Sequence, residues 1–279
     1  GLYEGTVTLW DEGLQHEDGS GHSAIQITLT LRVLDFRLQS DPAKSYSVYT
    51  YLGNSVQYGD RPEEFKREAM GNEYRAMAEL GIDTYPTLSL SYDAVADTMI
   101  LRYADELPRM HAAGLRGPVP VGGGNAIDVI YKRMTPGGER AAHWRIDKMP
   151  PPAFYKEVTR AFSALKQQAQ AEGWPELIIC PLDEVDASRS DFGAGVYRAV
   201  RDAGFRTYIT KNPLASDATP YHEGVDIWCS QPFSTPYESI VGQDRFEYWS
   251  YPNHNAGEIK DRRVMQKGGR MSYGYGLWR

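Results

Sequence analysis

The stretch LIICPLDE, residues Leu177–Glu184, joins a run of apolar residues directly to two acidic residues. The apolar part has the length of a strand that is buried on both faces, and we predict a strand at Leu177–Leu182. A helical pattern at Ser190–Ala203 ends at Gly204, and a further strand is predicted at Arg206–Thr210. A strand, a helix and a strand in this order predict two parallel strands with the helix packed across them.

The same alternation of short strands and helices extends over most of the chain. A helix is predicted at Pro62–Leu80, with Gly81 as its stop signal, and a short helix is predicted to end at Gly114. A further helix is predicted from the apolar face formed by Phe154, Val158, Phe162 and Leu165, and another at Ile259–Gln266. The remaining strands are predicted at Tyr46–Leu52, Thr84–Leu90, Pro118–Val121, Val225–Ser230 and Phe246–Ser250, with residues 92–103 as a hairpin insertion.

Strands that alternate with helices predict an α/β fold, and we expect a (β/α)8 barrel of TIM type with about seven of its strands visible. A doubly wound open sheet is the main alternative. No GxGxxG motif follows the first strand, and the run Gly122-Gly123-Gly124-Asn125 lacks the spacing of a phosphate-binding loop. Both observations favour the barrel.

Residues 1–41 follow a different pattern. Apolar and polar side chains alternate from Ile25 to Val33, which is the period of a half-buried strand, and Thr6–Trp10 resembles another strand. Because two or three strands do not form a stable sheet alone, we expect the C-terminal remnant of a β-sandwich here. Asp41-Pro42 marks the boundary, and residues 42–279 form the expected barrel domain. The chain starts without Met and ends where an eighth strand is due, so we expect a segment of a longer protein.

The composition limits the classes of function. The 279 residues include 30 basic and 37 acidic side chains, a net charge of −7, whereas nucleic-acid-binding proteins usually carry a basic surface. No apolar run reaches the roughly 20 residues of a membrane span. Tyrosine is abundant, with 19 residues, and its flat ring and hydroxyl suit a sugar site and a β-rich core equally well.

Metal and thiol chemistry are not expected. The six histidines are scattered and form no HExxH motif, so we predict no metal site and no cofactor. Cys180 and Cys229 each lie in an apolar, strand-like run, which favours two buried free thiols over a disulfide.

Polar and aromatic residues follow the predicted strands, at the edge where barrel enzymes hold their active sites. Amides and carboxylates can bind sugar hydroxyls, and aromatic rings can cover the apolar faces of sugars. We therefore expect a glycan or oligosaccharide substrate bound by Tyr92, Asp93, Asn125, Lys211, Gln231, Trp249, Tyr251, Asn253 and His254.

Several aromatic and histidine residues have a structural alternative. Trp249 or Tyr251 could instead fill the barrel, and His254 could be a hydrogen-bonded loop residue. The segment His143-Trp144-Arg145 could cover the cleft or pack on the surface.

Asp183 and Glu184 are the strongest catalytic candidates. Two adjacent acids directly behind a buried strand are costly to place in a cleft unless they are used or solvated. Cleavage of a glycosidic bond needs a carboxylic acid beside the leaving oxygen, and a neighbouring carboxylate can tune such an acid. The alternative is a solvated acidic loop in which Asp186 or Ser188 caps the next helix.

From about Tyr46 onward the chain resembles the catalytic barrels of bacterial glycoside hydrolases that follow an N-terminal β-sandwich. It is similar in particular to glycoside hydrolase family 123, the β-N-acetylgalactosaminidases, and to related barrel domains. The resemblance rests on the order of sandwich and barrel, on Asp183-Glu184 and on the aromatic segment Tyr248–Asn253. It implies substrate-assisted, retaining hydrolysis of a β-N-acetylhexosaminide, with Glu184 as general acid/base and Asp183 orienting the 2-acetamido group. It also implies a bacterial protein located outside the cell or in the cell envelope.

Two other classes of function stay open, because a fold does not determine a function. A non-catalytic carbohydrate-binding or cell-surface structural protein on a barrel scaffold would bind glycans without releasing a product. A barrel enzyme of another kind, such as a lyase or a phosphate-handling isomerase, would use the same edge of the sheet for different chemistry.

Overall fold

The computed structural model describes residues 2–10, 24–32, 45–47, 59–230 and 246–250. The chain divides into two compact units, Gly1–Lys44 and Ser45–Arg279.

The first unit contains an antiparallel ribbon of β1 (Leu2–Trp10) and β2 (Ala24–Arg32). The register places apolar residues of both strands on one face and mostly polar residues on the other, because side chains alternate along a strand. The apolar face is exposed and consists of Tyr3, Gly5, Val7 and Leu9 beside Leu31, Leu29, Ile27 and Ile25. The expectation that this ribbon belongs to a β-sandwich stays a prediction.

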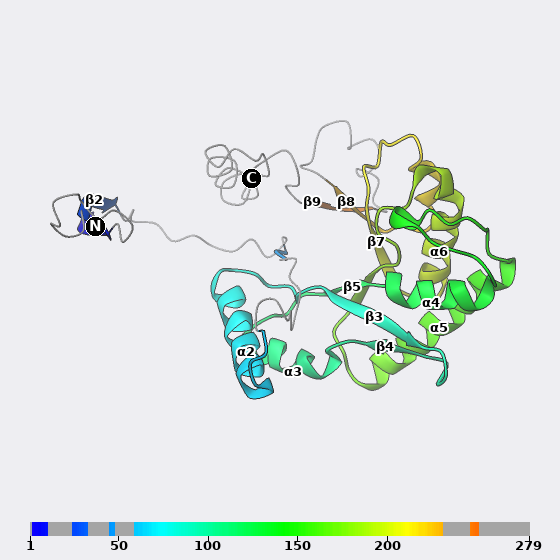
Figure 1. The fold of residues 1–279 in the computed structure, drawn as a ribbon, viewed down its shortest axis with the longest axis horizontal. Helices are drawn as coiled ribbons and strands as arrows, with labels where there is room; N and C mark the ends of the chain where they lie inside the picture. Colours follow the sequence, from blue (N-terminus) through cyan, green and yellow to red (C-terminus); the bar gives the residue numbers. More distant parts are fainter. Residues whose placement is uncertain (1, 11–23, 33–44, 48–58, 231–245, 251–279) are drawn as a thin grey trace, which may run out of the picture. The chain divides into compact units, whose positions relative to one another are not determined.

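The second unit is built on a mostly parallel sheet of seven strands in the order β4-β3-β5-β6-β7-β8-β9 (Figure 1). The strands are β3 (Leu88–Asp93), β4 (Thr98–Leu101), β5 (Val119–Gly122), β6 (Leu177–Cys180), β7 (Arg206–Thr210), β8 (Ile227–Ser230) and β9 (Glu247–Ser250). Only β4 is antiparallel to its neighbour, and it forms a hairpin with β3. The expected α/β class and the hairpin insertion are confirmed.

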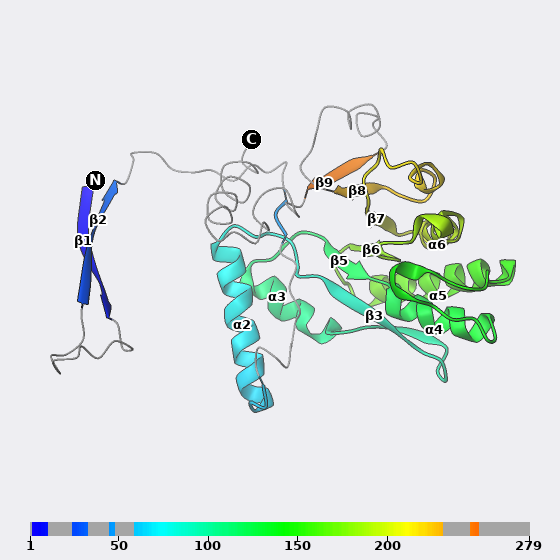
Figure 2. The ribbon, with the colours of Figure 1, turned by 45° about the horizontal axis from the view of Figure 1, so that its top comes forward.

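From β3 to β9 the parallel strands follow one another in chain order. Such an order returns each crossover helix to the same face, because parallel crossovers are right-handed. Figures 1 and 2 show three of these helices side by side on that face, namely α4 (Gly124–Met134), α5 (Pro152–Ala171) and α6 (Ser190–Asp202). The helices α2 (Glu63–Glu79) and α3 (Leu107–Ala113) pack against each other. The described strands form no closed ring.

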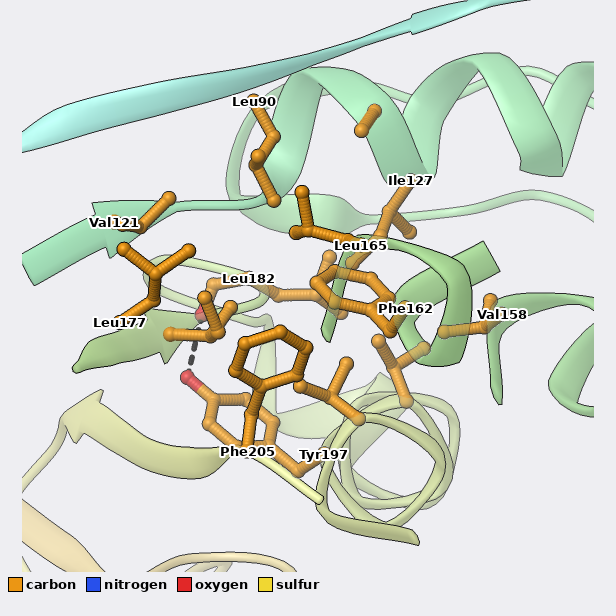
Figure 3. Close-up of a cluster of buried hydrophobic side chains, with 14 of the residues drawn as sticks. Leu90, Val121, Ile127, Val158, Phe162, Leu165, Leu177, Leu182, Tyr197 and Phe205 are labelled. Carbon is orange, nitrogen blue, oxygen red and sulfur yellow. Dashed lines mark hydrogen bonds between the residues drawn. The ribbon is translucent and has the colours of Figure 1, made fainter. Parts of the chain in front are cut away.

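The main core lies between the sheet and these helices (Figure 3). In β6, Leu177 and Ile179 point into this core, whereas Ile178 and Cys180 belong to the opposite face of the strand. The Tyr197 hydroxyl of α6 donates a hydrogen bond of 2.8 Å to the Leu182 carbonyl. Helix α6 is thereby fastened to the segment that directly follows β6.

Most of the predicted elements are confirmed, with shifted ends. The prediction for Thr84–Leu90 is wrong in its bounds, because Pro86 has no N–H for a sheet ladder and β3 begins only after it. As a result, Tyr92 and Asp93 lie inside β3 and not behind it. Helix α4 was not predicted, because its first residue, Gly124, belongs to a glycine run that is atypical of a helix.

Two predicted elements fall largely outside the described residues. The helix at Ile259–Gln266 lies wholly outside them, and the strand at Tyr46–Leu52 is represented only by its first two residues. There the Tyr46 carbonyl accepts hydrogen bonds from the N–H groups of Asp83 and Thr84.

Candidate active site

The acidic pair lies in a short segment whose neighbours on both sides are buried. Leu182 is fully buried and Val185 nearly so, whereas Asp183 and Glu184 between them are exposed. The Leu182 carbonyl is held by Tyr197, as described above. The order Leu-Asp-Glu-Val therefore anchors the chain at both ends and turns the two carboxylates outward at the carboxyl edge of β6.

Asp183 is fixed by the next strand. Its Oδ1 accepts a hydrogen bond from the Thr210 hydroxyl, at the end of β7. The strand register sets Thr210 beside Cys229 of β8, and Cys229 beside Trp249 of β9. Directly paired residues of parallel strands point to the same side, so these three side chains form one row on the face away from the helices.

Glu184 is fixed by a different part of the chain. Its Oε2 lies 2.9 Å from the Nδ1 atom of His143, and both side chains are about 60% exposed, at 62% and 60%. His143 comes from the segment between α4 and α5, so the contact joins residues 41 positions apart. The two acids of the pair thus have separate partners.

The backbone around this contact is strained. Glu184 has φ 49°, His143 has φ 54° and Trp144 has φ 50°. These are three of the five non-glycine residues with positive φ in the described part of the chain. Each such residue costs of order 1–3 kcal/mol, whereas an exposed ion pair contributes about 0.2–1 kcal/mol. The His143–Glu184 contact therefore does not offset the strain, a situation typical of functional sites.

The turn Ala142–Arg145, here called the His143 strap, is held in place by several contacts. The Trp144 side chain is buried, with its ring 6.3 Å from that of Phe192 and the Arg140 guanidinium 4.5 Å over it. Arg145 Nη2 lies 2.9 Å from Asp186 Oδ2, and the Asp186 N–H donates to the His143 carbonyl at 2.7 Å.

The glycine run allows β5, β6 and the strap to approach closely. A Cβ on Gly123 would lie 3.2 Å from Pro181 Cα, and one on Gly124 would lie 3.2 Å from the Trp144 ring. The Gly123 N–H donates to the Cys180 carbonyl at 2.8 Å. Glycine therefore allows close packing at this place.

The prediction of free thiols is confirmed, with Cys180 buried and Cys229 partly buried. Burial, together with the negative charge of Asp183, raises the pKa of Cys229 to about 12, and the same causes raise the pKa of Cys180. Both thiols are therefore protonated near neutral pH, which makes them poor nucleophiles.

The remaining acid of the segment, Asp186, caps the short helix η3 (Ala187–Arg189). Its Oδ1 accepts from the Ser188 N–H at 2.9 Å. Hydrogen bonds from Ser188 and Arg145 lower the pKa of Asp186 well below its ordinary value. The capping role that the sequence offers for Asp186 is confirmed.

Three of the predicted substrate-binding residues have contacts within the fold. Tyr92 is buried on the helix face of β3, where its hydroxyl donates to Asp97. Asp93 Oδ1 accepts from the N–H groups of Val95 and Ala96 in the hairpin turn, and these bonds lower its pKa. Lys211 Nζ lies 2.7 Å from Asp217 Oδ2, with both side chains largely buried. Their role in binding a substrate stays a prediction.

Two further predicted residues lie at the carboxyl edge. Asn125 is exposed in the first turn of α4, directly behind β5. Trp249 lies in β9, with its ring 5.2 Å from that of Tyr208 and its Nε1 donating to Glu247 at 2.6 Å. The other four candidates, Gln231, Tyr251, Asn253 and His254, fall outside the described residues.

Sequence reasoning missed Thr210 and gave His143 only a covering role. Thr210 is the last residue of a predicted strand, and its side chain points to the opposite face from that of Ile209, because side chains alternate along a strand. Its position at the carboxyl edge could therefore have been predicted from the sequence. The pairing of His143 with Glu184 carries no local signal, because it depends on how the segment between α4 and α5 folds back.

No helix in the described part of the chain is both long and apolar enough for a membrane span. Among the same residues, no three His, Cys, Asp or Glu side chains are grouped to hold a metal ion. No family model matches the chain, and no curated protein or solved structure matches it either.

Proposed function

We propose that this protein is a glycoside hydrolase with Glu184 as its general acid/base and Asp183 as the residue that orients the substrate. The observation that carries the proposal is the separate fixing of two adjacent carboxylates at the carboxyl edge of β6. Asp183 is held by Thr210, and Glu184 is held by His143 in a strained backbone. Two carboxyl groups in different surroundings can take two different roles in one reaction.

We further propose that the sheet belongs to a (β/α)8 barrel. The chain order of the parallel strands supports this, because doubly wound sheets change direction at an internal switch point. Ile178 and Ile227 lie on the face away from the helices and are nevertheless fully buried. A covered second face with polar groups at its carboxyl edge is the arrangement of a barrel active site.

The proposed reaction cleaves a β-N-acetylhexosaminide with help from the substrate. The acetamido oxygen attacks the anomeric carbon while the bond to the leaving oxygen breaks and that oxygen takes the Glu184 proton. Asp183 hydrogen bonds to the acetamido N–H and holds it in line. Water then attacks the same carbon, returns its proton to Glu184 and restores the acetamido group. Trp249, in the same row as Thr210, offers a ring for the sugar face.

The test is hydrolysis of methyl β-glycosides with and without a 2-acetamido group, because a methoxide leaving group needs a proton to depart. Glu184→Gln is expected to lower kcat/KM by roughly 10²–10⁴-fold, the usual contribution of a general acid. Asp183→Asn is expected to lose activity chiefly on the N-acetylated substrates. Glu172→Gln serves as the matched control, because Glu172 is an exposed acid at the far end of α5.

Wild-type rates in Glu184→Gln would contradict the proposal. Glycan binding by the wild type without any release of product would favour a carbohydrate-binding protein instead. If only Asp183→Asn is harmless, the acetamido mechanism is wrong and a conventional hydrolase remains.

A further inference from the structure

We infer that His143 is a positioning residue for Glu184, and that the His143 strap is a built part of the active site. This inference rests on the proposed function and adds a residue from a different element to it. The direct contact is the 2.9 Å approach of His143 Nδ1 to Glu184 Oε2. The contact brings the Glu184 carboxyl group to the strap and so limits the orientations that it can take.

The strap is fastened independently of this contact. Trp144 is buried between Phe192 and Arg140, and Gly124 leaves the space that its ring occupies. The Trp144 ring therefore anchors the turn in the main core. His143 is the exposed residue directly before Trp144, and its side chain lies against Glu184 at the carboxyl edge of β6.

A second set of bonds ties the strap to the acidic segment itself. Arg145 pairs with Asp186, and the Asp186 N–H donates to the carbonyl of His143. Arg189 Nε also donates to the Ile146 carbonyl at 2.8 Å. The segments that carry His143 and Glu184 are thus joined on both sides of the contact.

The strain is concentrated on the same residues. His143, Trp144 and Glu184 all have left-handed backbones, although none of them is Gly, Asn or Asp. A solvated loop has no need of such geometry, because a common conformation would expose the same side chains. The strain serves to bring one imidazole to one carboxylate.

The effect on the reaction follows from geometry. A general acid protonates the leaving oxygen only when its proton points at that oxygen, and a misplacement of about 1 Å costs roughly 100-fold in rate. Loss of the His143 imidazole leaves Glu184 present and free to rotate. We therefore expect kcat to fall while KM stays near its wild-type value.

The experiment compares His143→Ala and His143→Asn by the hydrolysis of methyl β-N-acetylgalactosaminide. His143→Ala is expected to lower kcat by roughly 10- to 100-fold. His143→Asn is expected to recover much of this loss, because its side-chain amide donates a hydrogen bond and Asn tolerates a left-handed backbone. Melting curves of both variants confirm that they fold.

A double-mutant cycle separates positioning from a general structural role. In the Glu184→Gln background, His143→Ala is expected to cause no further loss, since there is no longer an acid to orient. The matched control is His111→Ala, which removes another exposed histidine that has one side-chain partner, Tyr85. This control is expected to keep the wild-type kcat.

Full activity of His143→Ala overturns the inference, and so does a loss that adds fully to that of Glu184→Gln. In both cases the activity of the wild type and the inactivity of Glu184→Gln leave the proposed function intact. A wild type that hydrolyses no glycoside overturns the proposed function and this inference together.

Discussion

At the scale of single residues, Glu184 combines an exposed side chain with a left-handed backbone. Its only partner among the contacts described here is the equally exposed His143. Asp97, in the turn between β3 and β4, has a similar φ of 54°, but its carboxylate pairs with Arg133 and Arg160. The two positions therefore allow strain and ion pairing to be compared.

We predict that Glu184→Gly leaves the melting temperature unchanged or raises it by up to about 4 °C, because glycine relieves the strain of a positive φ. The same substitution abolishes hydrolysis. Asp97→Gly relieves the same kind of strain but removes two arginine partners, so its melting temperature is expected to fall. Calorimetry of the two variants measures both effects, and a clear destabilisation by Glu184→Gly would argue against strain at the site.

The sequence predicted the place of the acidic pair but not its partners. Asp183 and Glu184 could be placed because an apolar run ends directly at them. Tyr92 was placed at the edge in error, since Leu88, Leu90 and Tyr92 share the buried face of a strand that starts after Pro86. The contact between His143 and Glu184 could not be predicted, because no motif or spacing in the sequence around either residue indicates that the two meet in the fold.

At the scale of elements, the hairpin of β3 and β4 is clasped to α4 and α5 by charged side chains. Arg133 of α4 and Arg160 of α5 both pair with Asp97 of the turn and with Glu157 of α5. The Tyr92 hydroxyl of β3 lies within the same network. This network of charged side chains, here called the clasp, holds the hairpin of β3 and β4, at one end of the sheet, against helices α4 and α5.

The clasp predicts a loss of stability in acid. Hydrogen bonds from Arg160 and Arg133 hold the pKa of Glu157 below its ordinary value of 4.5. The stabilisation by a carboxylate of lowered pKa is complete above the unfolded value and disappears as the pH falls through the folded value. The contribution of Glu157 therefore begins to decrease below about pH 4.5 and is lost at the lower pH of the folded-state pKa.

We predict that Glu157→Gln melts at a lower temperature than the wild type at pH 6 and that this difference shrinks toward pH 3. Glu172→Gln, which alters an exposed acid, is expected to follow the wild-type curve throughout. Melting temperatures measured from pH 6 to pH 3 provide the check. A difference that stays constant with pH would mean that the Glu157 carboxylate adds no stability through its charge.

Elements with a clear period were predictable, whereas those that depend on close packing were not. The heptad-like face of α5 and the strand Arg206–Thr210 could be placed from their own residues. Helix α4 was not predicted because it begins at Gly124, and glycine has a low helix propensity. Those glycines are explained only by Pro181 and Trp144, which approach them in the folded chain.

At the scale of the whole molecule, the buried core described here belongs to the second unit, where helices cover one face of the sheet. The opposite face carries the row of Thr210, Cys229 and Trp249, and Asp183 reaches it from the edge of β6. The chain order of the strands brings these residues together although they lie between positions 183 and 249 of the chain. The core between the sheet and the helices thus stabilises the second unit, and the proposed active-site residues lie at the carboxyl edge of the sheet.

The central claim is that Glu184 protonates the leaving group of a glycoside, and the dependence of rate on the leaving group tests it most directly. Glu184→Ala and the wild type would be compared on 2,4-dinitrophenyl and methyl β-N-acetylgalactosaminides. A dinitrophenolate departs without a proton, so kcat/KM, which reports the step that releases the leaving group, is expected to fall about tenfold or less for its substrate. For the methyl glycoside, kcat/KM is expected to fall roughly 10²–10⁴-fold. Equal losses on both substrates would contradict the assignment of Glu184 as the general acid.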